Sequence, residues 1–588
     1  MKKTLALVLA LLMVLALFAG CGNEPAPANA TNAPAADKTA APAKSDAPAS
    51  SDPDSPYCLA AGRYEVDENG HPVSKYVYDA PLCTNDETLS YWTTCYTPQY
   101  IPEGGWGEIP TWQKVREYTG VHIEYVIVDS ANRSQNFSVL LASDDLDDIM
   151  DGASSFYKAG TLKSAVEDGY FANMADYTEY LPNYMWEIYD RSKYNKNVLA
   201  KLYYDDETIP TLYGLVMDPC PAMGYFLRQD WMDKLGLGQA VDVKTYDQFH
   251  KVMLAFKSAY STAEREIFPF FVNSNIENYQ SCFFGGFDTT VYTTSMAYAR
   301  VKNGTVEFCG ATEDDRDAMQ LLVDWYKEGL ISPNYLTFVP GDSFDAGQHT
   351  DGLGAHNMPV SSWNSSERES ENPECHWEVI PRTKKTEDQE FHYGYAKAAD
   401  NYSYASCAVS GKCTNIPLAA SWIDWSFSDF GADYVSFGEE GYLWEYNDKG
   451  ERRLTEWCLT HEASSSWIMC IYGASGLTNC VLFANLRNYY YEGGDRELYG
   501  FEVLKVKDYK GEYDWPSACT FTDEERTETT ALFADLNTYF AENYAAFVDG
   551  SKPMSDWDSY IDGLNSFGYE RIKEIYQDAY ARFQARSL

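Results

Sequence analysis

The sequence contains many carboxylates, but none of them lies in a spacing that marks a known catalytic centre. No GxSxG, HExxH or Walker-type phosphate loop occurs, and the segment from Gly352 to Gly354 lacks the third glycine of GxGxxG. None of the eight histidines stands in a recognised spacing with a Ser, Cys or metal-ligating partner, which favours structural or solvated roles. A carboxylate pair for glycoside hydrolysis stays open, because such pairs meet only in the folded chain. These observations favour binding over catalysis.

Rings, carboxylates and hydroxyl groups that could bind a sugar follow several of the predicted strands. A sugar has apolar C–H faces and many hydroxyl groups, so its site needs aromatic rings together with polar side chains. Each ring could instead be buried in the core, and Asp151 could instead cap a turn. The candidate ligand-binding residues are Trp92, Tyr96, Asp151, Ser154, Phe156, Tyr157, Asp218, Trp363 and Trp444. The loop beyond Tyr96 continues with Tyr100 and Trp106.

The ring-rich stretch from Trp422 to Tyr446 divides into two parts. Leu418, Trp422 and Trp425 are spaced to lie on one face of a helix, which predicts core packing through Phe437. The following Gly-Glu-Glu-Gly sequence predicts a turn. Trp444, beyond this turn, stays a candidate for stacking on a ligand.

Strands and helices alternate around these candidates. Residues 87–95 predict a strand, residues 110–119 a helix and residues 121–128 a second strand, which together form a βαβ unit. A short strand is expected over residues 148–150, directly before Asp151. Ligands of such α/β sheets bind at the carboxyl ends of the strands. The chain from Thr522 onward predicts three closing helices.

The first 56 residues predict an export signal followed by a tether. A positive start and an apolar stretch from Thr4 to Ala19 are typical of a signal peptide, and the stretch is shorter than the roughly 20 residues of a spanning helix. It ends in Leu-Phe-Ala-Gly-Cys21, which resembles the bacterial lipobox. We expect a lipoprotein signal peptide over residues 1–20, lipidation at Cys21, and an Ala/Pro/Ser-rich tether over residues 21–56. A plain secretory signal with an incidental cysteine is the alternative.

Charge and cysteine content narrow the class of protein further. The formal net charge of −43 excludes nucleic acid as a partner, because the protein would repel phosphates. At 588 residues the chain is long enough for two cores. Thirteen of the 14 cysteines follow Cys21 without any CxxC spacing, which disfavours a zinc site. Export permits disulfides, with Cys407–Cys413 and Cys470–Cys480 as sequence-near candidates, but an odd count leaves at least one thiol free.

Several segments, in this order, resemble the corresponding parts of the family 1 extracellular solute-binding proteins, the lipoprotein receptors of bacterial ABC importers. They are residues 112–124, 141–149, 213–216, 227–237, 416–425, 437–441 and 557–580. Their order and spacing cover nearly the whole mature chain, and the predicted lipid anchor agrees with them.

The resemblance implies an α/β, two-lobed, periplasmic-binding-protein-like fold with a hinge between the lobes and helices at the C-terminus. The first lobe would comprise residues 57–217 and about 393–447, and the second residues 218–392 and about 448–588. Asp151 and Trp363 stand where the family places ligand contacts. The chain is then expected to be a monomer without a cofactor, lipid-anchored on the outer face of the bacterial cytoplasmic membrane. It would capture a neutral oligosaccharide and deliver it to the ABC transporter permease subunits.

One departure from the family concerns calcium. Many relatives carry an Asp-rich calcium loop, but residues 258–269 lack its alternating oxygen ligands, so we predict no metal there. A surface-anchored glycan-degrading enzyme remains the alternative function. Within the receptor class, peptides or other small solutes remain alternative ligands.

Overall fold

The computed structural model describes residues 55–586 except 96, 194–196, 216–222, 275–282, 292–294, 297, 339–346, 395–401, 463–467, 470, 474–493 and 507–508. The predicted signal peptide, Cys21 and nearly all of the predicted tether lie outside the described residues, as do Tyr96 and Asp218. All described residues belong to one unit of the chain, Asp46–Leu588.

The first sheet contains the strands predicted around Asp151. Its strands are β1 (Thr88–Cys95), β2 (His122–Asp129), β3 (Ile149–Asp151), β4 (Leu212–Leu215) and β10 (Tyr402–Val409), in the order β2-β1-β3-β10-β4. β1 pairs in parallel with β2 and β3, whereas β10 pairs antiparallel with β3 and β4. Helix α2 (Pro110–Thr119) connects β1 to β2, so the predicted βαβ unit is confirmed.

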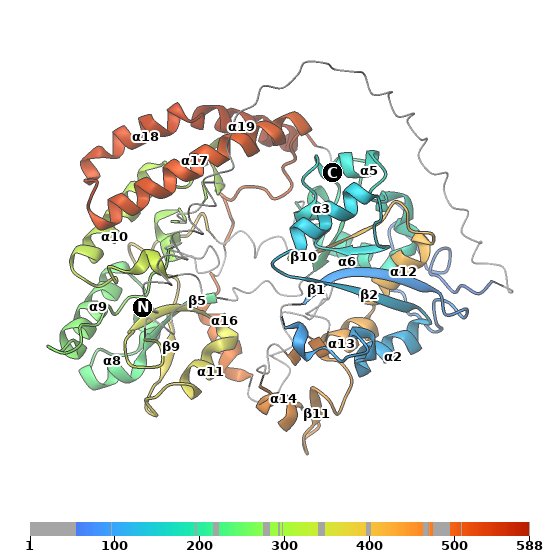
Figure 1. The fold of residues 1–588 in the computed structure, drawn as a ribbon, viewed down its shortest axis with the longest axis horizontal. Helices are drawn as coiled ribbons and strands as arrows, with labels where there is room; N and C mark the ends of the chain where they lie inside the picture. The colour runs from blue at the N-terminus through green and yellow to red at the C-terminus, as the bar shows by residue number, and fades with distance from the viewer. Residues whose placement is uncertain are drawn as a thin grey trace, which may run out of the picture. The chain divides into compact units, whose positions relative to one another are not determined.

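Helices cover both faces of this sheet, and Figure 1 shows β1 and β2 between α3 on one side and α2 and α13 on the other. Leu89 and Tyr91 of β1 point into a large core, whereas Trp92 points into a smaller core on the opposite face, as a pleated strand requires. The larger core includes α2, α6 (Pro182–Ser192), α7 (Asn197–Leu202), α12 (Ile416–Trp425) and α13 (Asp429–Phe437). The smaller core includes α3 (Arg133–Ser143), α4 (Ala153–Phe156) and α5 (Leu162–Glu167).

A separate core surrounds a second sheet. This sheet is antiparallel and has the order β8-β5-β9, with strands β5 (Met223–Arg228), β8 (Ala355–Pro359) and β9 (Trp377–Val379). A hairpin of β6 (Ala299–Lys302) and β7 (Thr305–Phe308) packs in the same part of the chain. The accompanying helices are α8 (Gln229–Leu235), α9 (Tyr246–Tyr260), α10 (Glu313–Lys327), α11 (Trp363–Arg368) and α16 (Asp495–Leu504).

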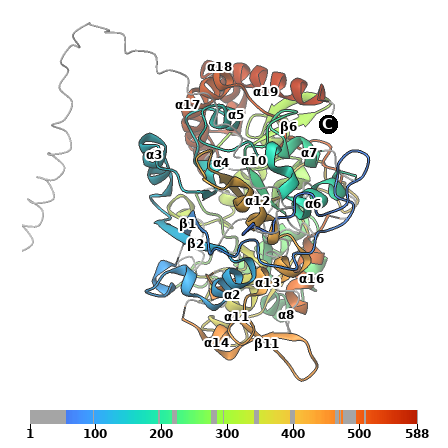
Figure 2. The same cartoon turned by 90° about the vertical axis from the view of Figure 1, so that its right-hand side faces the viewer.

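The three predicted C-terminal helices are confirmed as α17 (Asp523–Asp549), α18 (Trp557–Ser566) and α19 (Tyr569–Gln584). They lie together in both views of the molecule (Figure 1 and Figure 2) and pack into the second core. The side chain of Thr522 accepts a hydrogen bond from the Glu525 N–H, and Glu525 completes a capping box at the start of α17.

The ring-rich stretch after Asn415 folds as predicted through Phe437. All residues of α12 are buried, and α13 ends at Gly438, where the backbone leaves the helical conformation. Beyond it, β11 (Trp444–Tyr446) pairs with β12 (Arg452–Leu454), and α14 (Glu456–Thr460) follows. The 3-10 helices are η1 (Pro98–Tyr100), η2 (Trp106–Glu108), η3 (Met174–Tyr180), η4 (Ala240–Asp242), η5 (Phe283–Phe287), η6 (Tyr335–Thr337), η7 (Val360–Ser362) and η11 (Met554–Asp556).

Two further expectations can be compared with the described residues. Cys407 and Cys413 are both free thiols, so this candidate disulfide is wrong, and the Cys470–Cys480 candidate lies outside the described residues. Of the helices in the described ranges, none is both long and apolar enough to cross a membrane.

Candidate functional site

The parallel strands bring the sequence candidates to one edge of the first sheet. Trp92 of β1 pairs with Val126 of β2 and with Met150 of β3, so the carboxyl ends of these strands lie at the same edge. The register also places Thr93 beside Asp151, the last residue of β3. Open α/β sheets bind their ligands at this edge, so Asp151 lies where a ligand of such a sheet would bind.

Asp151 has a buried carboxylate that is only half satisfied by the described part of the chain. The residue is 6% exposed. The Thr93 hydroxyl donates a hydrogen bond to Asp151 Oδ2 at 3.1 Å, whereas Oδ1 is buried with no partner among the described residues. Burial raises the pKa of Asp151 to about 7, against the opposing effects of the Thr93 hydrogen bond and the Arg133 charge. A ligand hydroxyl group would supply the missing partner.

The backbone after Asp151 is held close to β10. Gly152 has a φ of 66°, and its N–H donates to the Ser406 carbonyl at 2.7 Å. The hydroxyl oxygens of Ser154 and Ser406 lie 2.6 Å apart. A Cβ atom on Gly152 would lie 3.0 Å from the Phe156 ring, so this position requires glycine for its conformation and leaves little space for a side chain. The Asp151 site is therefore built from β1, β3, α4 and β10.

The rings near Asp151 differ in how much of each remains accessible. Trp92 is buried, and its indole N–H donates to Asn136 Oδ1 at 2.8 Å. Tyr157 is also buried and packs against Phe171. Phe156 is half-buried, with its ring centroid 5.7 Å from that of Trp92. Phe156 is thus the ring of this group that can still meet a ligand, with Trp92 behind it.

The guanidinium group of Arg133 lies 4.9 Å from the centroid of the Phe156 ring. Arg133 begins α3, directly after β2, and its charge lowers the pKa of Asp151. The site therefore combines a carboxylate, a cation, hydroxyl groups and an aromatic ring at one sheet edge. Such a set can hydrogen-bond sugar hydroxyl groups and pack against a sugar face.

Trp363 and Trp444 are enclosed by protein, and the structure does not bring them to Asp151. Trp363 is 0% exposed, donates its indole N–H to the Trp377 carbonyl at 2.7 Å, and has the Arg496 guanidinium 4.1 Å from its ring centroid. Trp444 is 7% exposed and donates to the Gly438 carbonyl at 3.0 Å. Each ring is buried in a core and donates its indole N–H to a backbone carbonyl, so neither belongs to the site assembled around Asp151.

Four residues of this site were missed from the sequence: Thr93, Arg133, Asn136 and Ser406. Thr93 could have been found, because it lies near the end of a predicted strand that was expected to neighbour β3. Arg133 and Asn136 follow the second predicted strand and could have been tested on the same ground. Ser406 had no such signal, because its contact with Ser154 depends on the insertion of β10 next to β3.

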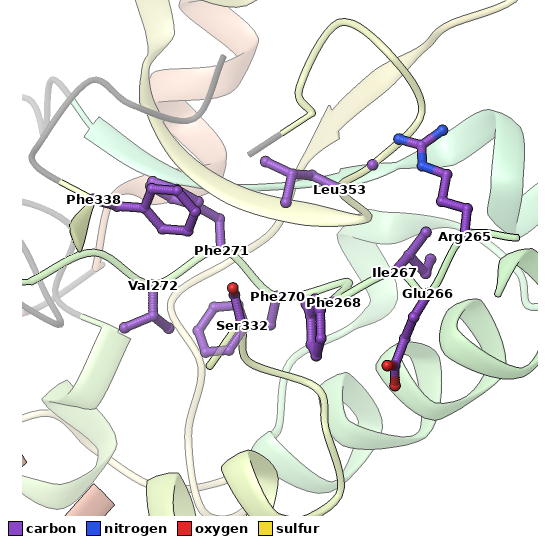
Figure 3. A pocket seen from close by; sticks show the side chains of 11 residues that line it. Arg265, Glu266, Ile267, Phe268, Phe270, Phe271, Val272, Ser332, Phe338 and Leu353 are labelled. Atoms are coloured by element: carbon purple, nitrogen blue, oxygen red, sulfur yellow. The ribbon is translucent and has the colours of Figure 1, made fainter. Parts of the chain in front are cut away.

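A small cavity occupies a different place, beside the second sheet (Figure 3). Its volume is about 90 Å³, and Phe268, Phe270, Phe271 and Phe338 are among its lining residues. Ligand sites for molecules of drug size measure roughly 300–1,000 Å³, so this cavity is too small for an oligosaccharide. It adjoins the stretch where relatives would carry a calcium loop. Across the described residues, no group of three or more His, Cys, Asp or Glu side chains is placed to hold a metal ion.

The chain as a whole is similar to known substrate-binding proteins. No family model matches it. It is 21% identical over 504 residues to the fructooligosaccharide ABC transporter substrate-binding protein FusA of Streptococcus pneumoniae, an alignment that covers 80% of this chain and 86% of FusA. An HMO-binding, ABC-transporter-associated solute-binding protein from Bifidobacterium longum infantis superposes with a TM-score of 0.64 at 15% identity, covering 86% of this chain and 100% of that one. The alginate-binding protein AlgQ2 without calcium gives 0.60 at 20% identity, covering 86% and 99%.

These similarities confirm the predicted fold class. The chain has the two-lobed α/β fold of solute-binding proteins, with its C-terminal helices packed into the second core. The predicted resemblance to substrate-binding proteins of ABC transporters is confirmed as well.

Proposed function

We propose that this chain is the substrate-binding component of an ABC importer and captures a neutral oligosaccharide at the sheet edge formed by β1, β3 and β10. The observation that carries this proposal is the buried carboxylate of Asp151, whose Oδ1 atom has no partner among the described residues. Phe156 and Ser154, both partly exposed, lie next to it in the chain. Capture requires only binding and lobe closure, without any chemical change of the sugar.

Two properties support a neutral sugar over an anionic ligand. The formal net charge of −43 repels anions at long range. At short range, Asp151 would oppose an anionic group whenever its own carboxyl group is ionised. FusA is described as a fructooligosaccharide substrate-binding protein, the Bifidobacterium protein as HMO-binding and AlgQ2 as alginate-binding, which supports a saccharide ligand for this chain; the two charge effects are what favour a neutral one.

The remaining features of the receptor are part of the same proposal. Cys21 carries the lipid anchor, residues 21–56 form the tether, and the protein works as a monomer with its permease at the outer face of the cytoplasmic membrane. We retain the lobe assignment with one revision. Because Cys458, Ile468 and Ile471 pack in the larger core of the first sheet, we place residues 448–473 with the first lobe.

A panel of fructo-, malto-, cello-, xylo- and manno-oligosaccharides tests the function. The purified protein should melt at a higher temperature with one series, since a ligand that binds the folded state stabilises it by mass action. Mass spectrometry should recover the sugar unchanged. Asp151→Ala should weaken binding roughly 10- to 150-fold, the effect of losing a hydrogen bond to a charged group.

Two results would overturn the proposal. If no saccharide of the panel raises the melting temperature, or only peptides do, the ligand class is wrong. If shorter sugars accumulate during incubation, the glycan-degrading alternative is right.

A further inference from the structure

A cluster of four rings surrounds helix α14, and we call it the α14 ring cluster: Tyr100, Trp457, His461 and Tyr472. The Trp457 ring centroid lies 5.1 Å from those of His461 and Tyr472, and His461 lies 5.3 Å from Tyr100. All three pairs meet edge to face. Trp457 nevertheless remains 40% exposed, so part of a large ring is presented to solvent.

Hydrogen bonds to the larger core fix the position of these rings. Thr455 caps α14, and its hydroxyl group donates to the Tyr442 carbonyl at 2.6 Å. Cys458, next to Trp457, is fully buried. On the other side, the Thr111 hydroxyl donates to the Tyr472 carbonyl at 2.6 Å, and the Trp106 indole donates to the Ile471 carbonyl at 2.7 Å. These hydrogen bonds and the buried Cys458 hold the exposed face of Trp457 in a defined position, as preorganised binding surfaces require.

The topology places the α14 ring cluster at the same sheet edge as Asp151. Because β1 and β2 are parallel, α2 must begin near the carboxyl end of β1 and end near the start of β2. Thr111 lies in the first turn of α2, so its partner Tyr472 lies on the side of α2 that is nearer the carboxyl ends of the strands. In both views, α14 lies beside β11 (Figure 1 and Figure 2), and the Thr455 N–H donates to the carbonyl of Leu443, the residue before β11.

A second group of surface rings has the opposite placement and serves as a comparison. Phe430 is 53% exposed, and its ring centroid lies 5.0 Å from that of Tyr118. Tyr118 lies in the last turn of α2, which is the edge where β2 begins. Of these two groups of surface rings, the α14 ring cluster is the one on the side of the ligand-binding edge.

We propose that the α14 ring cluster is a further saccharide subsite, in which the face of one sugar unit stacks on Trp457. The proposal rests on the oligosaccharide function proposed above. Glu456 and Glu462 are exposed beside the rings and offer acceptors to the sugar hydroxyl groups. η2, whose Trp106 is hydrogen-bonded to Ile471 beside the cluster, packs against β2. β2 in turn lies two strand spacings, roughly 10 Å, from β3. Contact with both Asp151 and Trp457 therefore needs a chain of sugar units, so the subsite would select for length.

Calorimetric titration with a length series of the saccharide that binds in the panel tests this subsite. Trp457→Ala should weaken binding of the longer members roughly 3- to 10-fold and leave the shortest member unchanged. Trp457→Phe should restore part of the affinity, because a ring can still stack. Phe430→Ala is the matched control, an exposed ring removed from the other edge, and should bind every length like the wild type.

The outcomes separate this inference from the function on which it rests. If the wild type binds no saccharide, the proposed function fails. If the wild type binds but Trp457→Ala matches it at every length, the subsite is wrong. An equal loss at all lengths would also overturn the subsite, because Trp457 would then act at the Asp151 site or through the fold. Normal saccharide binding with reduced stimulation of a permease in vesicles would make the cluster a protein-docking surface instead.

Discussion

Asp151 and Asp424 are both buried aspartates, but their hydrogen bonding differs. Asp424 accepts hydrogen bonds from the Tyr78 hydroxyl, the Asn183 amide and the Tyr184 N–H at 2.7, 2.9 and 2.8 Å. Asp151 accepts one from Thr93 and keeps Oδ1 without a partner in the described structure. Burying such an atom costs roughly 1–3 kcal/mol. Asp424 therefore stabilises the fold, whereas Asp151 has the features of a residue retained for binding.

The Asp151→Asn variant should gain stability relative to the wild-type protein as the pH rises. Burial raises the pKa of Asp151 to about 7, above the value of about 3.9 for an unfolded Asp. Between these values the folded carboxyl group holds a proton that the unfolded chain has lost, so the wild-type free energy of unfolding falls as the pH rises. Asn lacks this dependence. Urea unfolding at about pH 5 and pH 8 measures the free energy of unfolding of both proteins. The value for the variant minus that for the wild type should be larger at pH 8 than at pH 5 by roughly 1–3 kcal/mol.

Two results would contradict this expectation. Parallel pH curves for Asp151→Asn and the wild type would mean that the carboxyl group titrates alike in both states. An Asp151→Ala variant that binds the saccharide as tightly as the wild type would remove Asp151 from the site.

Residue type alone predicted which side chains could bind a sugar but not which of them are accessible. Asp151 was found because it follows a short predicted strand, a local pattern that the fold preserves. Trp363 and Trp444 share the chemistry of a stacking ring, yet they are buried against Trp377 and the Gly438 backbone. Their burial depends on distant packing. Trp457, which is exposed, was not singled out, because its neighbours Tyr100 and Tyr472 come from other parts of the chain.

At the level of elements, the βαβ unit was predictable because its signals are local. The helix that connects β1 and β2 is bounded by Pro110 at its first position and Gly120 after its last. The place of β10 was not predictable. It separates β3 from β4 through antiparallel pairs such as Ala408 with Met150, a contact between residues far apart in the sequence. The predicted strands thus end within one residue of the observed ones, while the serine that β10 brings to them was missed.

Gly120→Ala should destabilise the protein more than Gly236→Ala. Both glycines follow a helix and have left-handed backbones, with φ of 70° and 66°. A Cβ on Gly120 would lie 1.9 Å from the Cys83 carbonyl oxygen, whereas a Cβ on Gly236 meets nothing within 4 Å. Gly236→Ala should therefore cost only the conformational term, roughly 1–2 kcal/mol, and Gly120→Ala should cost more because the backbone must move. Urea unfolding of the two variants measures this, and equal losses would contradict the steric argument.

At the scale of the whole molecule, the last helices of the second core are hydrogen-bonded to helices of the first sheet. Asp523, at the start of α17, accepts hydrogen bonds from the Thr161 N–H at 2.6 Å and the Ser164 hydroxyl at 2.7 Å. Tyr204, just after α7, donates to the Phe521 carbonyl at 2.6 Å. The two cores thus share polar contacts, both between side chains and between side chains and backbone.

Among the residues that make such contacts between the two cores, Arg586 is the one whose substitution should lower stability most clearly. Just beyond α19, its guanidinium donates to the carbonyls of Ala200, Tyr203 and Asp205 at 2.8, 3.1 and 3.1 Å. Arg586→Ala leaves these carbonyls at the end of α7 without that donor, which should lower the free energy of unfolding by roughly 1–3 kcal/mol. Because the contact joins two cores, its loss should also make the urea transition less cooperative.

Arg571→Ala is the matched control for this prediction. Arg571 lies on the same helix, α19, but pairs with Glu528 of α17 within the second core at 2.7 Å, on the exposed surface. Solvent screens the charges of such an exposed ion pair, which therefore contributes little to stability, so this variant should unfold nearly like the wild type and with the same steepness. If Arg586→Ala behaves like Arg571→Ala, the cores do not depend on Arg586 for their coupling. If Arg586→Ala alone broadens the transition, the end of the chain helps to hold the lobe that carries Asp151 against the other.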